Sequence, residues 1–226
     1  MCFLLKTWIP GEAPDKEEMK EQLDVAKKKL YDLQMKIKEH KLPVLVLFEG
    51  WSAAGKGSMI GKVIKTIDPR FFKVATMSAP SGEELRRPFL YRVMCQIPEQ
   101  GKFTFLDSGW MEQTTQEVLH KKLEGEDYEK RIESIRRFER QLTDNGYLVL
   151  KFLMQIDKDE QKARMDKLCA SKDTRWRVSD FDKWQQEHYH KCEKVYDRYL
   201  KDTNASTSPW YIIDARDKKW AELQVM

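Results

Sequence analysis

Apolar residues in this chain alternate between short continuous runs and longer stretches with helical spacing. The first run, 44–48, lacks polar alternation, which is typical of a strand buried on both faces. The runs are rich in β-branched and aromatic residues. They lie at 44–48, 71–77, 102–107, 146–156 and 208–214. Strands that alternate with helices predict an α/β fold, in which helices cover both faces of a central parallel sheet of about five strands.

Helical spacing is clearest between residues 15 and 40, where apolar positions recur at steps of three and four. Asp15 precedes this stretch and is a suitable N-cap. The apolar seam packs either on the main sheet or on another subunit, and the sequence leaves both open. We therefore divide the chain into an N-terminal arm with an amphipathic helix, 1–42, and a main domain, 43–226. Further helices are expected at 59–67, 83–95, 111–122, 128–143, 158–170 and 179–200, and from 215 onward.

The loop after the first strand has the composition of a phosphate cradle. Gly50 and Gly55 allow the backbone to curl so that successive N–H groups point inward, and Lys56 adds a mobile charge. The spacing fits a Walker A motif, except that Gly57 stands where a Ser or Thr hydroxyl usually holds Mg²⁺. Ser58 follows about 100° further round the helix and is a poor substitute. The residues expected to bind phosphate here are Gly50, Ala53, Ala54, Gly55, Lys56, Gly57 and Ser58.

Asp107 ends the apolar run at 102–107 and is placed as a Walker B carboxylate that holds Mg²⁺. The alternative interpretation is a helix N-cap. In parallel sheets ligands gather at the carboxyl ends of the strands, so Asp107 and the glycine-bounded loop are expected along one edge.

Basic residues cluster in two places. Arg70 follows the first helix, and Arg164, Arg175 and Arg177 belong to a charged stretch, 164–182, that is expected to form a lid. These arginines could bind phosphate, with Arg177 as a catalytic group, or could lie on solvated faces.

The overall composition is 41% apolar and 35% charged, which is typical of a globular protein. The net charge of +4 is too modest to indicate a nucleic-acid binder. Neither a signal peptide nor an apolar run of about 18 residues is present, so no membrane partner is expected. Four scattered cysteines suit reduced thiols, and a cytoplasmic location is expected.

Several short motifs occur together between residues 43 and 219. They are Phe48-Glu49-Gly50, 53–57, Ile67-Asp68-Pro69-Arg70, Pro80-Ser81, Asp107 with Trp110, Phe138-Glu139-Arg140, Lys151-Phe152, Trp176-Arg177 with Ser179 and Asp182, Pro209-Trp210 and Asp214-Ala215. In these motifs the chain resembles the type-2 polyphosphate kinases, in which Gly57 is the normal residue. The resemblance implies a P-loop kinase-like three-layer sandwich with a helical lid. It also implies Mg²⁺-dependent phosphoryl transfer between inorganic polyphosphate and AMP or ADP, with Lys56, Asp107 and Arg177 as catalytic residues.

Two residues depart from the family pattern. Ser52 replaces a usual Asp and Ser108 a usual Arg, which resembles the less active half of the family's tandem-domain members. The partners implied are polyphosphate, AMP, ADP and ATP, and either a homo-oligomer or a fused second copy of the fold. Two other functions remain open: a catalytically weakened polyphosphate- or nucleotide-binding domain that supports an active one, and an ATP-dependent nucleoside monophosphate kinase.

Overall fold

The computed structural model describes residues 5–77 and 79–226. A wholly parallel sheet of five strands in the order β2-β3-β1-β4-β5 forms its centre, which confirms the predicted α/β fold. The strands are β1 (Val44–Gly50), β2 (Phe72–Thr76), β3 (Phe103–Asp107), β4 (Leu148–Gln155) and β5 (Trp210–Asp214). In β1, the middle strand, six successive residues are buried, as expected for a strand covered on both faces.

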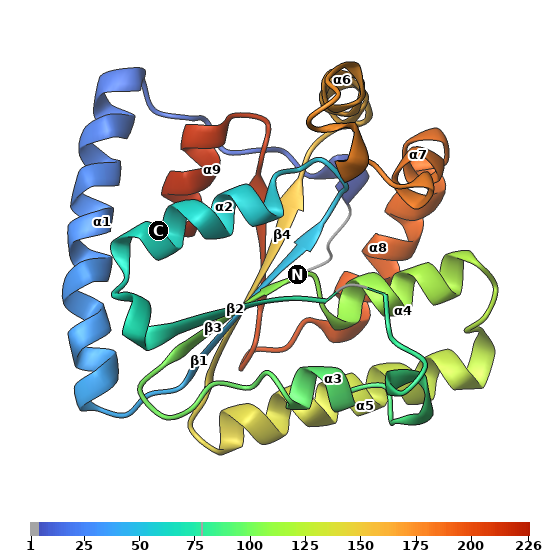
Figure 1. Cartoon of the computed structure of the whole chain (residues 1–226), viewed down its shortest axis with the longest axis horizontal. Helices are drawn as coiled ribbons and strands as arrows, with labels where there is room; N and C mark the ends of the chain where they lie inside the picture. Colours follow the sequence, from blue (N-terminus) through green and yellow to red (C-terminus); the bar gives the residue numbers. More distant parts are fainter. Residues whose placement is uncertain (1–4, 78) are drawn as a thin grey trace.

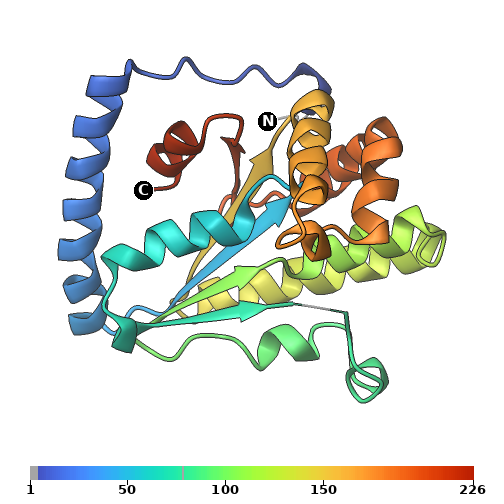
Figure 2. The ribbon, with the colours of Figure 1, turned by 45° about the horizontal axis from the view of Figure 1, so that its top comes forward.

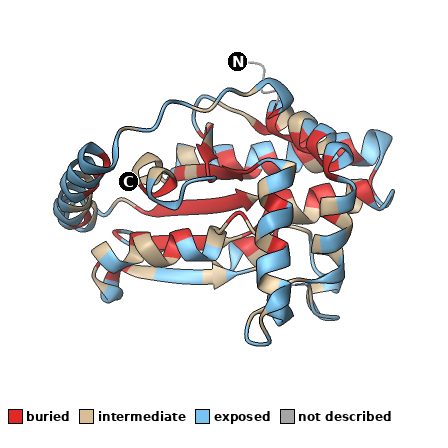
Figure 3. Cartoon of the chain, turned by 90° about the horizontal axis from the view of Figure 1, so that it is seen from above, coloured by how far each residue is buried: buried red, intermediate tan, exposed pale blue. Residues whose placement is uncertain are grey.

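Helices form a layer on each side of the sheet (Figures 1 and 2). One layer contains α2 (Lys56–Val63) and α9 (Lys218–Val225), with α1 (Lys16–Glu39) packed outside them. The other contains α4 (Trp110–Leu119), α5 (Gly125–Asp144) and α8 (Tyr189–Thr203), which contact one another. The predicted three-layer arrangement is therefore correct, and most of the buried apolar residues lie between the layers (Figure 3).

The remaining helices are α3 (Tyr91–Met94), α6 (Lys158–Ala170) and α7 (Asp180–Glu187). Both α6 and α7 lie near the carboxyl ends of the strands, and the short 3₁₀ turn Arg175–Arg177 joins them (Figure 2). The lid expected at 164–182 is thus the second half of α6, this turn and the start of α7. Among residues 5–77 and 79–226, no helix combines the length and apolar character needed to cross a bilayer.

Two helices that were predicted as continuous are interrupted in the structure. The helix expected at 83–95 is only a 3₁₀ turn, Glu84–Arg86, and then α3, because Pro88 between them cannot donate a helical hydrogen bond. The helix expected at 179–200 is divided at His188 into α7 and α8. This break turns the chain so that the Tyr189 ring stacks on Trp51 at 3.9 Å.

The amphipathic helix at the N-terminus is confirmed. The Asp15 carboxylate accepts hydrogen bonds from two backbone N–H groups of the first turn, and Met19 and Leu23 of the seam are buried. Because α1 contacts α9, the part of the seam with Met19 and Leu23 packs within the chain, whereas Leu33 of the same seam is 48% exposed. Of the predicted arm, residues 1–4 lie outside the described part of the structure.

Candidate active site

The glycine-bounded loop lies between β1 and α2, and its two glycines meet different requirements. Gly50 has φ 122°, and a Cβ there would lie 2.5 Å from the Met154 carbonyl oxygen, so only glycine fits beside β4. Gly55 has φ 95° and turns the chain into the first residue of α2, Lys56. The Lys56 ammonium lies within 3.3–3.4 Å of two backbone carbonyls at the start of the loop. The loop therefore curls around the lysine that the sequence predicted as its charge.

Gly57 has a physical reason that the motif alone did not provide. A Cβ at Gly57 would lie 2.8 Å from Oδ2 of Asp107, so the glycine gives room to this carboxylate. The structure thus brings Asp107 to the loop, at the carboxyl end of β3. Burial raises the pKa of Asp107 above its usual 3.8, and the nearby Lys56 charge partly offsets this effect.

A basic cavity of about 620 Å³ opens beside the loop. It is bounded by the loop, α6 and the start of α9, and Asp107 is the only carboxylate among its described lining residues. Such an excess of positive charge suits a multiply charged anion. The cationic side chains that line it are Lys56, Lys62, Arg164, Lys167, Arg177 and Lys218.

A second cavity, of about 210 Å³, adjoins the loop at Ser52 and is almost wholly polar. Lys56 and Arg177 line both cavities, so the two meet at these cations. Glu112, in the first turn of α4, lines the second cavity and also a third of about 310 Å³, which contains Phe89 and Trp110. Polar and aromatic surfaces thus continue from Lys56 toward the ends of β2 and β3.

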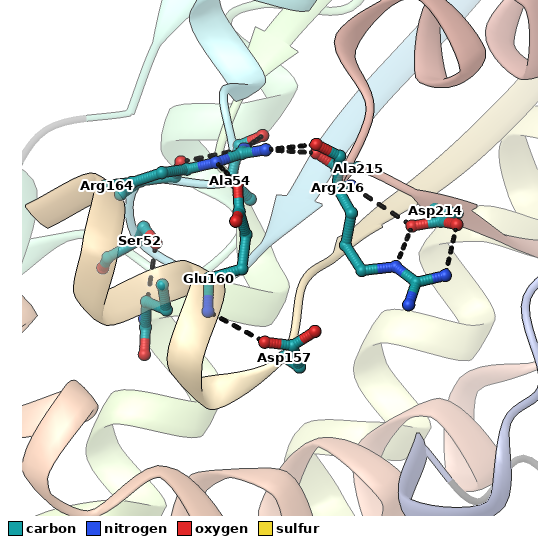
Figure 4. Close-up of polar contacts among 10 residues, drawn as sticks. Ser52, Ala54, Asp157, Glu160, Arg164, Asp214, Ala215 and Arg216 are labelled. Carbon is teal, nitrogen blue, oxygen red and sulfur yellow. Dashed lines mark hydrogen bonds and ion pairs between the residues drawn. The ribbon is translucent and has the colours of Figure 1, made fainter.

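The four arginines that were predicted to bind phosphate lie in different places. Arg177 is exposed but lines both cavities at Lys56, whereas Arg175 is exposed and lines neither. Arg164 lies at the basic cavity, with its guanidinium on backbone carbonyls (Figure 4). The structure does not bring Arg70 to the loop, because Arg70 precedes β2 at the opposite end of the strands and pairs with Asp68 at 2.7 Å.

Sequence reasoning missed the contacts made by Ser52. Its hydroxyl donates to Oδ1 of Asp182 at 2.5 Å, and its backbone N–H donates to Oε1 of Gln185 at 2.9 Å. Both partners lie on α7, one turn apart. Asp182 also completes a capping box with Ser179, and only that local role was visible in the Ser-x-x-Asp spacing.

For Glu49, the residue before the loop, the sequence left two roles open, an indirect contact with the metal or a pair with a lysine. The Glu49 carboxyl group is buried and accepts hydrogen bonds from the backbone N–H groups of Met111 and Glu112 at the start of α4. Burial raises the pKa of Glu49 from 4.5 to about 8, and the Glu112 charge adds to this effect. Glu49 therefore joins β1 to the helix that follows Asp107.

The Asp107 carboxylate suits a cation that is bound partly by the protein and partly by the phosphates of a substrate. Within the described part of the chain, no three His, Cys, Asp or Glu side chains gather into a metal-binding group. Mg²⁺ is often bound through one or two carboxylates, with water and substrate phosphates as the other ligands. Asp107, which lines the basic cavity beside Lys56, has the oxygen donors for such a role.

Comparisons with known proteins agree with this geometry. The model of the family "Polyphosphate kinase 2 (PPK2)" matches residues 13–226. An AMP/ADP-polyphosphate phosphotransferase of Meiothermus ruber is 30% identical over 96% of this chain and 83% of its own length. A polyphosphate:AMP phosphotransferase of Pseudomonas syringae pv. tomato is 32% identical over 84% of this chain, and the match spans 38% of its length. That of Pseudomonas aeruginosa is 29% identical over 95% of the chain and 44% of its own length, so this chain spans well under half of these two relatives.

Solved structures give the same result. Polyphosphate kinase 2 from Arthrobacter aurescens TC1 superposes with a TM-score of 0.92 at 26% identity, over 99% of this chain and 82% of the other. A putative polyphosphate kinase 2 from Pseudomonas aeruginosa gives 0.91 at 28% identity, over 98% of this chain and 48% of the other. These similarities cover the sheet, both helical layers and the loop.

Proposed function

Because the chain belongs to the polyphosphate kinase 2 family, we propose that it transfers a phosphoryl group between inorganic polyphosphate and AMP or ADP. The observation that carries the proposal is the meeting of two cavities at Lys56 and Arg177. A direct transfer needs donor and acceptor phosphates to meet at one cationic point, because little covalent chemistry is required of the protein.

The two cavities suit different substrates. The larger one, with six cations and a single carboxylate, fits the polyphosphate chain. The smaller polar cavity continues to the third one, where the partly exposed Phe89 offers aromatic surface, and this path fits the nucleotide. A phosphoryl group would then pass from one side of Lys56 to the other.

Each residue has a defined task in this proposal. Lys56 and the loop amides hold phosphate oxygens, and Arg177 approaches the same point from the lid. Asp107 would hold Mg²⁺, which spreads the charge of the transferring group when it is bound. Arg175, at the exposed turn between α6 and α7, would contact phosphate only if a long substrate extended that far.

The test is transfer from polyphosphate to AMP and to ADP, measured by nucleotide chromatography with and without Mg²⁺. Lys56→Ala is expected to lower kcat/KM by roughly 100-fold or more, because it removes a charge at the reacting phosphates. Lys73→Ala changes an exposed lysine on the edge strand β2 and serves as the control. Full activity of Lys56→Ala would overturn the proposed role of that lysine.

One observation favours a second candidate function, a weakened domain that binds polyphosphate or nucleotide without efficient transfer. The Ser52 hydroxyl donates a hydrogen bond to Asp182, and a serine offers no carboxylate to a metal ion or to the groups around a phosphate. Binding of polyphosphate and ADP by calorimetry, with no transfer in either direction, would support this alternative.

A further inference from the structure

Arg164 has no hydrogen-bond donor left for a ligand. An arginine side chain has five N–H donors. Its Nε donates to Glu160 Oε1 at 2.6 Å, and Nη1 donates to the carbonyls of Ala53 and Ala54 at 3.4 and 3.2 Å. Its Nη2 donates to the carbonyls of Ala215 and Arg216 at 2.7 and 2.9 Å. Five donors thus meet five oxygens, four of them on two separate backbone segments (Figure 4).

We propose that Arg164 is a positioning residue that ties the phosphate-binding loop to the 215–216 turn and so sets the width of the basic cavity, rather than a ligand of phosphate. The inference rests on the proposed function of that cavity. The loop and Ala215 both line it, and Arg164 spans them.

The set of hydrogen bonds from Arg164 to the two backbone segments, here called the brace, also fixes the direction of a loop amide. In a trans peptide the C=O and the following N–H point to opposite sides. Because the Ala54 carbonyl is held by Arg164, the N–H of Gly55 is turned away from Arg164. Gly55 N–H is one of the amides proposed to hold phosphate, so loss of the brace would loosen the cradle itself.

Neighbouring contacts make both ends of the brace firm. Gln161, one turn earlier on α6, donates to the Ser52 carbonyl at 3.3 Å. At the other end, Asp214 accepts from Nε and Nη2 of Arg216, both at 2.9 Å, and from its backbone N–H at 3.2 Å. The guanidinium therefore connects two segments that are each held independently.

Arg164→Lys and Arg164→Gln separate the two roles. Lysine keeps the charge, but its single ammonium cannot span both backbone segments. For a positioning residue we expect both variants to lose turnover alike, roughly 10- to 100-fold in kcat, with the polyphosphate KM changed much less. For a phosphate ligand, Arg164→Lys would retain most of the activity and only Arg164→Gln would lose it, which would overturn the proposal.

Two measurements remain informative if the protein shows no transfer at all. Deuterium exchange should become faster in 51–58 and 214–217 in both variants, while unchanged exchange in these segments would contradict the brace. Polyphosphate binding measured against salt gives the second readout, because each cation that contacts a polyanion adds about one unit to the slope. Arg164→Gln should leave this slope unchanged, whereas a decrease like that from a direct phosphate ligand would overturn the proposal.

Lys167→Gln is the matched control, because Lys167 also lines the basic cavity from α6 but makes none of these backbone contacts. It should leave deuterium exchange in 51–58 and 214–217 as it is. Failure of the proposed function would appear as absent transfer by the unmodified protein, whereas failure of the brace would appear as unchanged exchange.

Discussion

At the scale of single residues, Gly57 shows that the absence of a side chain can be the functional feature. The Walker A pattern treats position 57 as a lost hydroxyl, but the structure uses the space for the Asp107 carboxylate, 2.8 Å from where a Cβ would stand. Gly57, the residue that departs from the Walker A pattern, is therefore the residue that lets the Asp107 carboxylate approach the loop.

Gly57→Ala tests this explanation. The added methyl must displace Asp107 or the loop, and a shift of this size costs roughly 10- to 100-fold in kcat. Gly61→Ala is the control, because it adds the same methyl to α2 with no atom within 4 Å and should stabilise the helix by about 0.5–1 kcal/mol. Equal transfer rates for the two variants and the unmodified protein would show that Asp107 needs no such space.

Glu49 predicts a pH dependence of stability. Its pKa is about 8 in the folded protein, raised by burial, against 4.5 for an ordinary glutamate. The folded state therefore binds the proton more tightly than the unfolded state, and stability should fall as pH rises from about 4.5 to about 8. The loss amounts to on the order of 3–5 kcal/mol at most.

Urea midpoints of the ligand-free protein between pH 4.5 and 9, compared with those of Glu49→Gln, measure this effect. The variant keeps an oxygen for the N–H groups of α4 and should lose the Glu49 part of the slope. Parallel pH profiles for the two proteins would contradict the raised pKa.

At the scale of elements, the sequence predicted those whose signal is local. Each strand is a largely apolar run of residues, although β2 and β4 each include a lysine. The run before the loop and the run that ends in Asp107 were enough to predict that Lys56 and Asp107 lie at one edge of the sheet. The break at His188 was missed because it accompanies the tertiary stacking of Tyr189 on Trp51, which no local sequence pattern predicts. Arg70 was misplaced because closeness in sequence was taken for closeness in space, although it precedes its strand and so belongs to the amino-terminal edge.

The contact between the loop and α7 could not be predicted from sequence, because Ser52 and Asp182 are 130 residues apart. It changes what restoring a carboxylate at position 52 would do. Ser52→Asp would place one carboxylate against another, so by itself it should not raise turnover and should destabilise the protein.

Ser52→Asp combined with Asp182→Asn should regain the stability that Ser52→Asp loses by itself, and it should turn over faster than Ser52→Asp alone. The asparagine can donate its amide to the new carboxylate while its oxygen still accepts from the Ser179 N–H, which Asp182 now binds at 2.7 Å. Urea unfolding of the two single variants and the double variant forms a thermodynamic cycle, with an expected coupling of roughly 0.5–3 kcal/mol. Additive effects would show that the two positions do not interact.

At the scale of the whole molecule, one buried ion pair connects β4 to three helices, α4, α5 and α8. Lys151 of β4 donates to Glu139 of α5 at 2.7 Å and to the Thr203 carbonyl of α8 at 2.9 Å. Glu139 also accepts from Trp110 Nε1 at 3.1 Å and from the Ser208 hydroxyl at 2.7 Å. Because Trp110 begins the helix that follows Asp107, the pair also stabilises the edge of the sheet at which Asp107 lies.

Removal of one member of this pair should be far more damaging than removal of both. Lys151→Met leaves the Glu139 carboxylate buried without its cation and should cost roughly 3–5 kcal/mol of unfolding free energy. Lys151→Met with Glu139→Gln should recover much of that loss, since the amide oxygen still accepts from Trp110. On the same helix, Arg137→Ala breaks an exposed pair with Glu133 and should cost only about 0–1 kcal/mol. If Lys151→Met were as mild as Arg137→Ala, the buried pair would contribute nothing to holding α4, α5 and β4 together.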